Sequence, residues 1–514
     1  MTGVQKIGVI FFLVGLVVFT VLPFVGTYTL TEDLVRSNTK EIHQDKMTEI
    51  LAPLYGEKFS SNFSFLSAFG EHFDTYNDGL KSQQLWDQVI WDDYSFALAK
   101  AALESPVRDY PWYFLGLSIG LAVLGGLLYA FPLYSQEPEG IKNNGIFHSK
   151  LMNRGWMGIA AGTYLILFYI LLYWFPAYLV NVVTMVDPIS TLLNGGPASQ
   201  WFLYGLIYTL AIIVFGIRMF RKYRGNKYQQ LRTASLIFFQ TGFAFLIPEI
   251  LVLLNKPYFD FKNIWPLDYD FFYDYQIETF LSSGGIGMFM LVWGILLILI
   301  GVPVFTYFFG KRWYCSWVCG CGGLAETLGD PFRQLSDKSV KAWKYERVIV
   351  HSVLVLVVLM TVVTLANYFS GFSFLGNVTN QLHSFYGFAI GSAFAGVVGT
   401  GFYPLMGNRV WCRFGCPLAA YLGLVQRFKS RFRITTNGGQ CISCGNCSTY
   451  CEMGIDVRWY AQRGQNIVRS SCVGCGVCSS VCPRGVLKLE NGPEKNRIND
   501  LPIIIGNDSI KLNP

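Results

Sequence analysis

The sequence predicts an α-helical integral membrane protein with about eight transmembrane helices, followed by a cysteine-rich C-terminal domain of helices and strands. Of its 514 residues, 52% are hydrophobic, 16% are aromatic and only 14% are charged, which is too apolar for a soluble chain of this length. A membrane core about 30 Å thick needs roughly 20 apolar residues per helix. Eight stretches meet this requirement: 7–29, 111–134, 156–183, 201–220, 234–254, 286–309, 347–369 and 384–406.

Charged loop residues predict which way these helices run, because basic loops stay in the cytoplasm. The loop after the fourth span contains six cations, Arg218, Arg221, Lys222, Arg224, Lys227 and Arg232. Another basic loop begins with Lys311 and Arg312, whereas 30–109 and 255–285 are rich in acids and are expected outside. Eight spans then place both termini in the cytoplasm. We interpret the net charge of +7 as this orientation signal, and no basic groove with interleaved aromatic residues predicts nucleic-acid binding.

The chain divides into three predicted blocks. Residues 1–134 form a transmembrane hairpin around an outward segment, in which the run from Ala97 to Leu103 predicts a helix. Residues 135–406 form a six-helix membrane domain. Residues 407–514 form a cytoplasmic domain that ends in a polar tail. The first apolar run is too long for a cleavable signal and is expected to remain as an anchor.

An internal repeat marks the middle block. After the sixth span come Gly310, Arg312, Tyr314, Cys315 and Cys319. After the eighth span come, at identical offsets, Gly407, Arg409, Trp411, Cys412 and Cys416. Each copy follows a helix that runs inward, so the two cysteine pairs are expected to reach the inner surface at similar depth.

All thirteen cysteines lie after position 314, and eight of them form two runs with the spacing C-x2-C-x2-C-x3-C. In bacterial two-cluster ferredoxins, the fourth cysteine of each run binds the other cluster. One 4Fe-4S cluster is therefore assigned to Cys441, Cys444, Cys447 and Cys482. A second is assigned to Cys472, Cys475, Cys478 and Cys451. The C-terminal block is accordingly predicted to be a ferredoxin-like α+β domain with two clusters.

Other residues in these runs bear on the assignment. Gly445, Gly474 and Gly476 leave room where the backbone turns closely. Structural zinc usually takes its ligands from two separated pairs, so zinc explains the doubled pattern less well. A disulfide framework is disfavoured because the outward segments before position 314 contain no cysteine. Glu452 stands where Pro483 follows the other run, which is expected to alter local charge and potential without removing a ligand.

The remaining cysteine pairs, Cys315 with Cys319 and Cys412 with Cys416, are expected beside the membrane. Each pair is spaced i to i+4 and would share one face if its segment is helical. Four converging thiolates favour an iron–sulfur centre, zinc or copper(I). A reversible dithiol and simple burial beside the bilayer are the alternatives, and the repeat favours a redox or metal role. Cys321 is unpaired and is interpreted as structural.

At these motifs the chain resembles the polyferredoxin-type membrane quinol dehydrogenases, which include NapH-like, NosR-like and CcoG-like 4Fe-4S membrane proteins. The resemblance covers roughly residues 156–514. Family members carry two C-x3-C-P motifs beside the membrane and a two-cluster ferredoxin. Cys412, Cys416 and Pro417 keep this motif, whereas Gly320 replaces proline after Cys319.

The resemblance implies a protein of the bacterial inner membrane that exchanges electrons between the quinone pool or cytoplasmic carriers and a partner outside. No flavin-attachment motif of the NosR type is present in 30–109, and no large outward domain of the CcoG type follows the ferredoxin. NapH-like proteins are therefore the nearest functional fit.

Cytoplasmic clusters alone cannot serve a partner across about 30 Å of hydrocarbon. The five histidines offer no pair at mid-membrane depth, which disfavours a bis-histidine haem and favours a mobile quinone as a further cofactor. Glu249 follows Pro248 near the outer end of the fifth span. Carboxylates within membranes are costly and often functional, so Glu249 is a candidate proton acceptor for quinol, with a solvated structural role as the alternative.

Three functions are consistent with these features. The first is electron transfer between quinone or cytoplasmic donors and an extracytoplasmic acceptor, in which the membrane cysteine pairs and Glu249 would take part directly. The second is reduction of a metal such as copper during assembly of a respiratory enzyme, and the third is redox sensing. The expected partners are the lipid bilayer, the quinone pool and a periplasmic or membrane redox protein.

Overall fold

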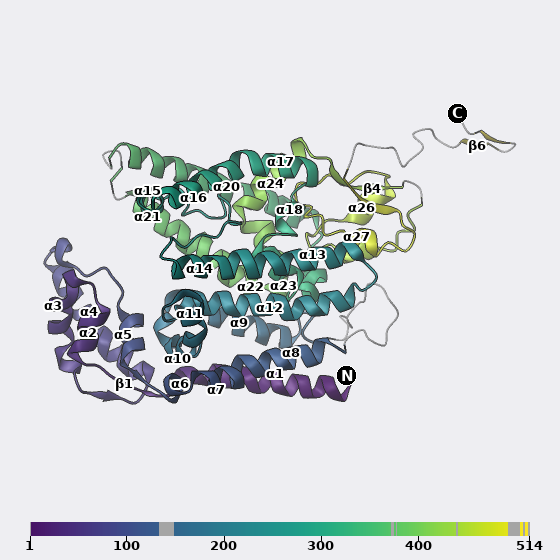
Figure 1. Cartoon of the computed structure of the whole chain (residues 1–514). Coiled ribbons are helices and arrows are strands. Elements are labelled where there is room, and N and C mark those ends of the chain that lie inside the picture. Colours follow the sequence, from purple (N-terminus) through teal and green to yellow (C-terminus); the bar gives the residue numbers. More distant parts are fainter. Residues whose placement is uncertain are drawn as a thin grey trace. The chain divides into compact units, whose positions relative to one another are not determined.

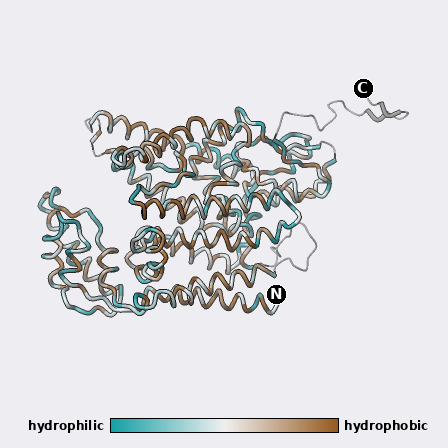
Figure 2. Tube along the Cα trace, viewed as in Figure 1, coloured by the Kyte–Doolittle hydropathy of each residue, from teal (hydrophilic) through white to brown (hydrophobic). Residues whose placement is uncertain are grey.

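The computed structural model describes residues 2–132, 149–371, 375–376, 378–437 and 440–491, together with the short strands β6 (Ile504–Gly506) and β7 (Ser509–Lys511) (Figure 1). Within these residues, eight helical stretches are long and apolar enough to cross a membrane. They are Gly3–Phe24, Pro111–Ala130, Trp156–Trp174, Gln200–Lys222, Lys227–Leu253, Gly284–Phe309, Val340–Phe369 and Val378–Gly401. Figure 2 shows hydrophobic colouring along these helices. The predicted α-helical membrane protein is thus confirmed.

The third span is shorter than predicted. Helix α9 (Trp156–Trp174) ends before Pro176, which has no N–H to continue the helical ladder. The rest of the predicted span forms the 3₁₀ turn η5 (Pro176–Leu179) and helix α10 (Val180–Thr184). Helix α11 (Asp187–Asn194) follows after a bend of 80°. The other predicted spans overlap the observed helices, and their ends differ by at most seven residues.

The chain forms two compact units, and each is described by itself. The first contains residues 1–136, 167–210 and 249–255, and the second contains 137–166, 211–248 and 256–514. The two compact units do not test the predicted blocks 1–134, 135–406 and 407–514, because each unit combines segments from different parts of the chain. The three blocks therefore stay a prediction. Their first boundary lies outside the described residues.

In the first unit, two membrane helices pack closely against each other. Helix α1 (Gly3–Val21) lies along α8 (Leu121–Ala130), which follows α7 (Pro111–Leu115) through the π-helical segment Gly116–Gly120. A Cβ atom on Gly8 would lie 2.8 Å from the carbonyl oxygen of Gly125. Small residues let membrane helices approach in this way, so this pair of glycines explains the close contact of α1 and α8.

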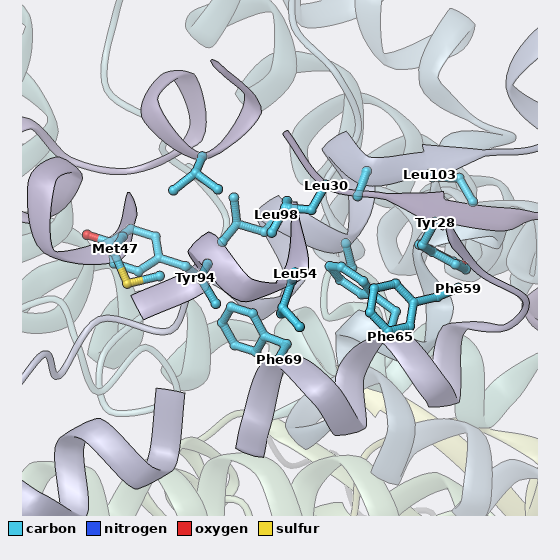
Figure 3. Packing of buried hydrophobic residues seen from close by; sticks show 14 of the residues in the cluster. Tyr28, Leu30, Met47, Leu54, Phe59, Phe65, Phe69, Tyr94, Leu98 and Leu103 are labelled. Carbon is cyan, nitrogen blue, oxygen red and sulfur yellow. The ribbon is translucent and has the colours of Figure 1, made fainter. Parts of the chain in front are cut away.

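Between α1 and α7 the chain folds into a small domain with its own hydrophobic core. Strands β1 (Thr27–Thr29), β2 (Lys58–Phe59) and β3 (Leu103–Glu104) form an antiparallel sheet in the order β2-β1-β3. Its helices are α2 (Glu32–Asn38), α3 (Glu41–Leu51), α4 (Asn62–Ser82), α5 (Ser95–Ala102) and α6 (Pro106–Asp109). Tyr28, Phe65 and Leu98 lie fully buried in the shared core (Figure 3). The sheet was not predicted, because strands of two or three residues show no alternating pattern.

The second unit combines membrane helices with a ferredoxin-type domain. Its longer helices are α13 (Lys227–Phe238), α16 (Gly284–Leu296), α17 (Val302–Phe309), α20 (Val340–Phe369), α21 (Val378–Tyr386) and α24 (Pro417–Phe428). Strand β4 (Phe432–Thr436) pairs antiparallel with β5 (Leu487–Asn491). Three short helices complete the domain, α25 (Asn446–Thr449), α26 (Val457–Gln462) and α27 (Val477–Ser480), and Figure 1 shows α26 and α27 with β4 at one end of α13. This is the predicted mixture of helices and strands.

The segment 256–273 packs into the helices of the second unit. The indole N–H of Trp293, in α16, donates to the carbonyl oxygen of Phe261 at 3.0 Å. Trp265 donates to the hydroxyl of Thr361, in α20, at 3.0 Å. Trp293 lies roughly 14 Å along the helix from the start of α16. This segment, predicted as part of an acidic outer loop, therefore inserts between helices, because its buried Phe259 and Ile264 need apolar neighbours.

Candidate metal centres

Four cysteines of the ferredoxin-type domain surround one hollow. Cys441, Cys444, Cys447 and Cys482 line a space of about 360 Å³, and Pro483 and Val486 complete its wall. Gly445 adopts the left-handed conformation at φ 80°, directly before α25. The structure thus brings together the first set of cysteines that the sequence assigns to a cluster.

A second hollow is surrounded by the other four cysteines. Cys451, Cys472, Cys475 and Cys478 line a space of about 400 Å³ with apolar neighbours such as Ile434 and Val473. Gly474 and Gly476 have positive φ values of 65° and 71°, as expected where the backbone turns closely. The backbone N–H of Ile455 donates to the sulfur of Cys451 at 3.3 Å. The second assigned set is therefore also brought together.

The more buried thiols around these hollows, those of Cys447, Cys472, Cys475 and Cys478, are costly to ionise without a cation. Burial raises the pKa of Cys447 and that of Cys472 to about 11. Burial also raises the pKa of Cys475 and Cys478, and neighbouring negative charges add to the effect. Bound iron would supply the positive charge that thiolates need here.

The spacing of the side chains fits a cluster better than a single ion. Across the described ranges, no three His, Cys, Asp or Glu side chains come close enough to hold one metal ion. In a cubane each cysteine binds a different iron, so the thiols stand further apart than around one zinc. Two hollows, each with four cysteines in its wall, fit 4Fe-4S clusters in this respect.

The membrane cysteines do not lie on single helices. Helix α18 (Arg312–Cys315) ends at Cys315, and Cys319 is the extended N-cap of α19 (Gly320–Glu326). Cys412 lies in the π-helical segment Trp411–Gly415, and Cys416 is the extended N-cap of α24. The expected i to i+4 helical face is therefore wrong, because both pairs span a helix end.

The four membrane thiols nevertheless converge. All four side chains are buried. Burial raises the pKa of Cys416, and the charges of Cys412, Cys315 and Cys319 raise it further. Burial likewise raises the pKa of Cys315 to about 12, with further contributions from Cys412 and Cys319. Each thiol thus lies within electrostatic range of thiols from the other copy of the repeat.

Cys321, interpreted from sequence as structural, belongs to this group. A hydrogen bond from its thiol lowers the pKa of Cys319 to about 6, against the opposing effect of burial. The charges of Cys412 and Cys416 act on Cys321 in turn. The sequence did not predict this grouping, because Cys321 lies outside the repeated C-x3-C pattern.

The inserted segment 256–273 also reaches the membrane cysteines. Lys262 forms an ion pair with Asp260 at 3.0 Å, and its positive charge helps to lower the pKa of Cys319. Further along the segment, Asp270 lies 2.7 Å from Nε2 of His383 in α21. A loop that was predicted to lie outside therefore brings a charged side chain, that of Lys262, within electrostatic range of the membrane cysteine Cys319.

A buried network of ion pairs connects the membrane cysteines with the second hollow. Glu326 accepts two hydrogen bonds from Arg232 and one from Arg333, all of 2.8 Å. Arg409 donates to Glu326 and, at 3.1 Å, to Glu452. None of these five residues is more than 1% exposed. We call Arg333, Arg409, Glu326 and Glu452 the arginine–glutamate bridge.

The two ends of this bridge contact cysteines. Nη1 of Arg333 lies 3.7 Å from the sulfur of Cys475, in the wall of the second hollow. Nη1 of Arg409 lies 3.8 Å from the sulfur of Cys412 and donates to the carbonyl oxygen of Cys315 at 3.2 Å. The bridge therefore touches a ferredoxin cysteine at one end and a membrane cysteine at the other.

Three cations interpreted from sequence as an orientation signal are buried partners of this network. Arg218 and Lys222 donate to Asp330 at 3.1 and 2.7 Å. Arg232 pairs with Glu326, as described above. Because these cations balance buried carboxylates, they indicate the direction of the helices less directly than predicted.

The two glutamates of the bridge differ in pKa. Burial opposes ionisation of Glu326, but the guanidinium groups of Arg232, Arg333 and Arg409 hold its pKa well below the usual range. Burial raises the pKa of Glu452, and the charge of Glu326 adds to this rise. Glu326 is thus the more firmly ionised member of the pair.

Glu249 and the cysteines belong to different compact units. Glu249 belongs to the first unit, whereas every cysteine belongs to the second. Its carboxylate accepts a hydrogen bond of 2.6 Å from Asn194, and its side chain is buried. The structure therefore gives Glu249 one polar partner in the same unit.

Comparison with known families matches three segments of the chain. The model for a 4Fe-4S binding domain matches residues 291–339 and 387–435, and the model for a 4Fe-4S dicluster domain matches residues 440–487. The first two segments contain the copies of the repeat, and the third contains both cysteine runs of the ferredoxin-type domain. Fold and matches together define a multi-pass membrane protein with iron–sulfur domains of the ferredoxin type.

Among curated sequences, the chain is similar to one from Escherichia coli (strain K12) that is described as "Putative electron transport protein YccM". The two are 28% identical over 159 residues, which span 29% of this chain and 43% of YccM. No solved structure shows a significant match. In general terms, these findings support a role in iron–sulfur electron transport.

Proposed function

We propose that this protein transfers electrons across the bacterial inner membrane, between quinol or a cytoplasmic donor and an acceptor outside the cytoplasm. One observation supports this best: two cysteine-lined hollows and a group of membrane thiols lie in one compact unit, and a buried charge network connects the second hollow with the membrane thiols. A chain of closely placed redox centres is what electron transfer through a membrane protein requires.

The cysteines around the two hollows would hold the clusters. Cys441, Cys444, Cys447 and Cys482 would hold one 4Fe-4S cluster. Cys472, Cys475, Cys478 and Cys451 would hold the other. The buried group Cys315, Cys319, Cys412 and Cys416 would hold a further iron–sulfur centre, which suits its spacing better than a single metal ion does. Each bound cluster supplies a one-electron carrier.

Quinol oxidation adds a requirement for proton acceptors. One quinol becomes quinone by losing two electrons and two protons, so the electrons must leave in two one-electron steps, one proton needs a base at the site and the other passes to water. Glu249 is our proposed base, because it is a buried carboxylate within a span. In this proposal both termini lie in the cytoplasm and the partner is a periplasmic or membrane redox protein.

Iron analysis of anaerobically purified full-length protein tests the proposal. We expect about eight iron atoms per chain for two cubanes, and about twelve if the membrane cysteines hold a third. Protein that stays colourless and free of iron after reconstitution would refute the electron-transfer function.

Turnover with a quinol analogue and an artificial acceptor tests the donor. Glu249→Gln is expected to slow quinol oxidation at least tenfold, because the amide cannot accept the proton. The control is Glu57→Gln, which changes an exposed carboxylate. Equal rates for the two variants would exclude Glu249 as the base, whereas absent turnover with iron-loaded protein would exclude quinol as the donor.

A further inference from the structure

We propose that the arginine–glutamate bridge raises the reduction potential of the cluster at Cys475 and of the centre at Cys412, and that it couples the two potentials. This inference rests on the proposed function, because both cysteine sets must hold redox centres. The bridge acts by positioning charge next to the cysteines, and no bond forms or breaks in it.

The contacts at the two ends give the sign of the effect. Guanidinium groups of Arg333 and Arg409 lie 3.7 and 3.8 Å from the sulfurs of Cys475 and Cys412. Reduction adds negative charge to an iron–sulfur centre, and that charge is shared with its cysteine sulfurs. Positive donors close to the sulfurs stabilise the reduced form and so raise the potential.

The charge of the whole network supports the same conclusion. It contains five cations, Arg218, Lys222, Arg232, Arg333 and Arg409. With all its carboxylates ionised, it contains three anions, Glu326, Glu452 and Asp330. Burying an excess of two positive charges is costly unless further anions lie nearby. Thiolate-bound clusters at Cys475 and Cys412, at the two ends, would supply those anions.

Shared carboxylates couple the ends. Glu326 accepts hydrogen bonds from both Arg333 and Arg409, and Glu452 lies within 3.3 Å of Arg333 and 3.1 Å of Arg409. In a buried environment such charges are weakly screened. A change of charge at Cys475 is therefore expected to shift the potential at Cys412 in the same direction, by a smaller amount.

Glu452 provides a test of opposite sign. It follows Cys451 directly, at the place that Pro483 occupies in the other run. Its ion pairs with Arg333 and Arg409 oppose the effect of burial and favour the ionised carboxylate. The negative charge opposes the two arginines, so removing it is expected to raise the potential, whereas removing Arg333 is expected to lower it. Damage to the fold would not produce opposite shifts from two neighbouring substitutions.

The experiment is a redox titration followed by electron paramagnetic resonance, on the full-length, iron-loaded protein in detergent. Arg333→Gln is expected to lower the equilibrium constant for reduction of the Cys475 cluster at least tenfold, or about 59 mV for one electron. Glu452→Gln is expected to raise it by a similar factor. Arg333→Lys keeps the charge and is expected to shift it less. The control is Arg154→Gln, which removes a cation that donates to the carbonyl oxygen of Leu335 at 2.9 Å.

The outcomes are distinct. Iron-loaded variants with unchanged potentials, or with shifts of the same sign for Arg333→Gln and Glu452→Gln, would overturn the bridge proposal and leave the proposed function intact. A shift confined to the Cys475 cluster would overturn the coupling. If Arg333→Gln does not fold, the direction of the Glu452→Gln shift decides. Wild-type protein without iron would overturn both proposals together.

Discussion

The two copies of the repeat have the same motif but differ in what their arginines contact. Gly310 and Gly407 both adopt positive φ with an extended ψ, a conformation open almost only to glycine. In both copies the second cysteine is the N-cap of the next helix. The backbone and the thiols therefore follow the repeat.

The arginines do not follow it. The guanidinium of Arg312 lies over the rings of Phe432 and Tyr228, 5.1 and 5.8 Å from their centroids, whereas Arg409 is buried between Glu326 and Glu452. Seven residues after its second cysteine the first copy has Glu326, and the second copy has Gly423 at that offset. One copy thus supplies a carboxylate and the other a cation, so the repeat places two matching cysteine pairs inside an asymmetric charge network.

The largest expected effect concerns the thiols that the copies share. If both copies hold one centre, Cys315→Ser and Cys412→Ser are each expected to abolish it and to lower the iron content by the same amount, about four atoms for a cubane. Iron analysis with spectroscopy measures this, and the two ferredoxin clusters should remain in both variants. A centre lost in only one variant would show that the copies are not equivalent.

The arginines should differ strongly in their contribution to stability. Arg409→Gln leaves buried carboxylates without a partner and is expected to lower the free energy of unfolding by about 3–5 kcal/mol. Arg312→Gln removes a half-buried cation that lies over two aromatic rings, and it is expected to lower the free energy of unfolding by about 1 kcal/mol. Chemical unfolding in detergent micelles compares the two. Equal costs would contradict the asymmetry.

Both glycines should resist replacement by alanine, and to a similar but not equal degree. Alanine at either position must adopt a conformation that costs about 1–3 kcal/mol. An added Cβ at Gly407 would also lie 2.8 Å from the backbone nitrogen of Ser336, and at Gly310 it would lie 2.6 Å from the Phe432 ring. Because a backbone yields less easily than a ring, Gly407→Ala is expected to be the more destabilising. The same unfolding measurement checks the order.

The smallest effect is expected where the first copy departs from the motif. Gly320 is the first residue of α19, and Cys319 before it is extended, which suits a following proline. Gly320→Pro, which restores the motif of the second copy, is expected to stabilise the protein by about 0.4–1 kcal/mol. A loss of stability in the same unfolding assay would show that α19 needs the glycine for another reason.

Local spacing explains most of what could be predicted from sequence. The eight helices followed from apolar length, and the α+β character of the C-terminal domain followed from its cysteine runs. The hollows around Cys441 and Cys472 are lined by the cysteine sets that the spacing assigned. Cys321 could not be assigned in this way, because its neighbours Cys412 and Cys416 are more than 90 residues away.

The sequence by itself determined the membrane helices and the grouping of the eight ferredoxin cysteines, because each depends on residues close together in the chain. Tertiary structure decided the inserted segment 256–273 and the arginine–glutamate bridge. Arg333 and Cys475 are 142 residues apart, and Arg409 and Glu326 are 83 apart. An arginine or lysine in the sequence looks the same whether it will lie in an exposed loop or in a buried ion pair. Only the tertiary structure shows which carboxylate and which thiol it contacts.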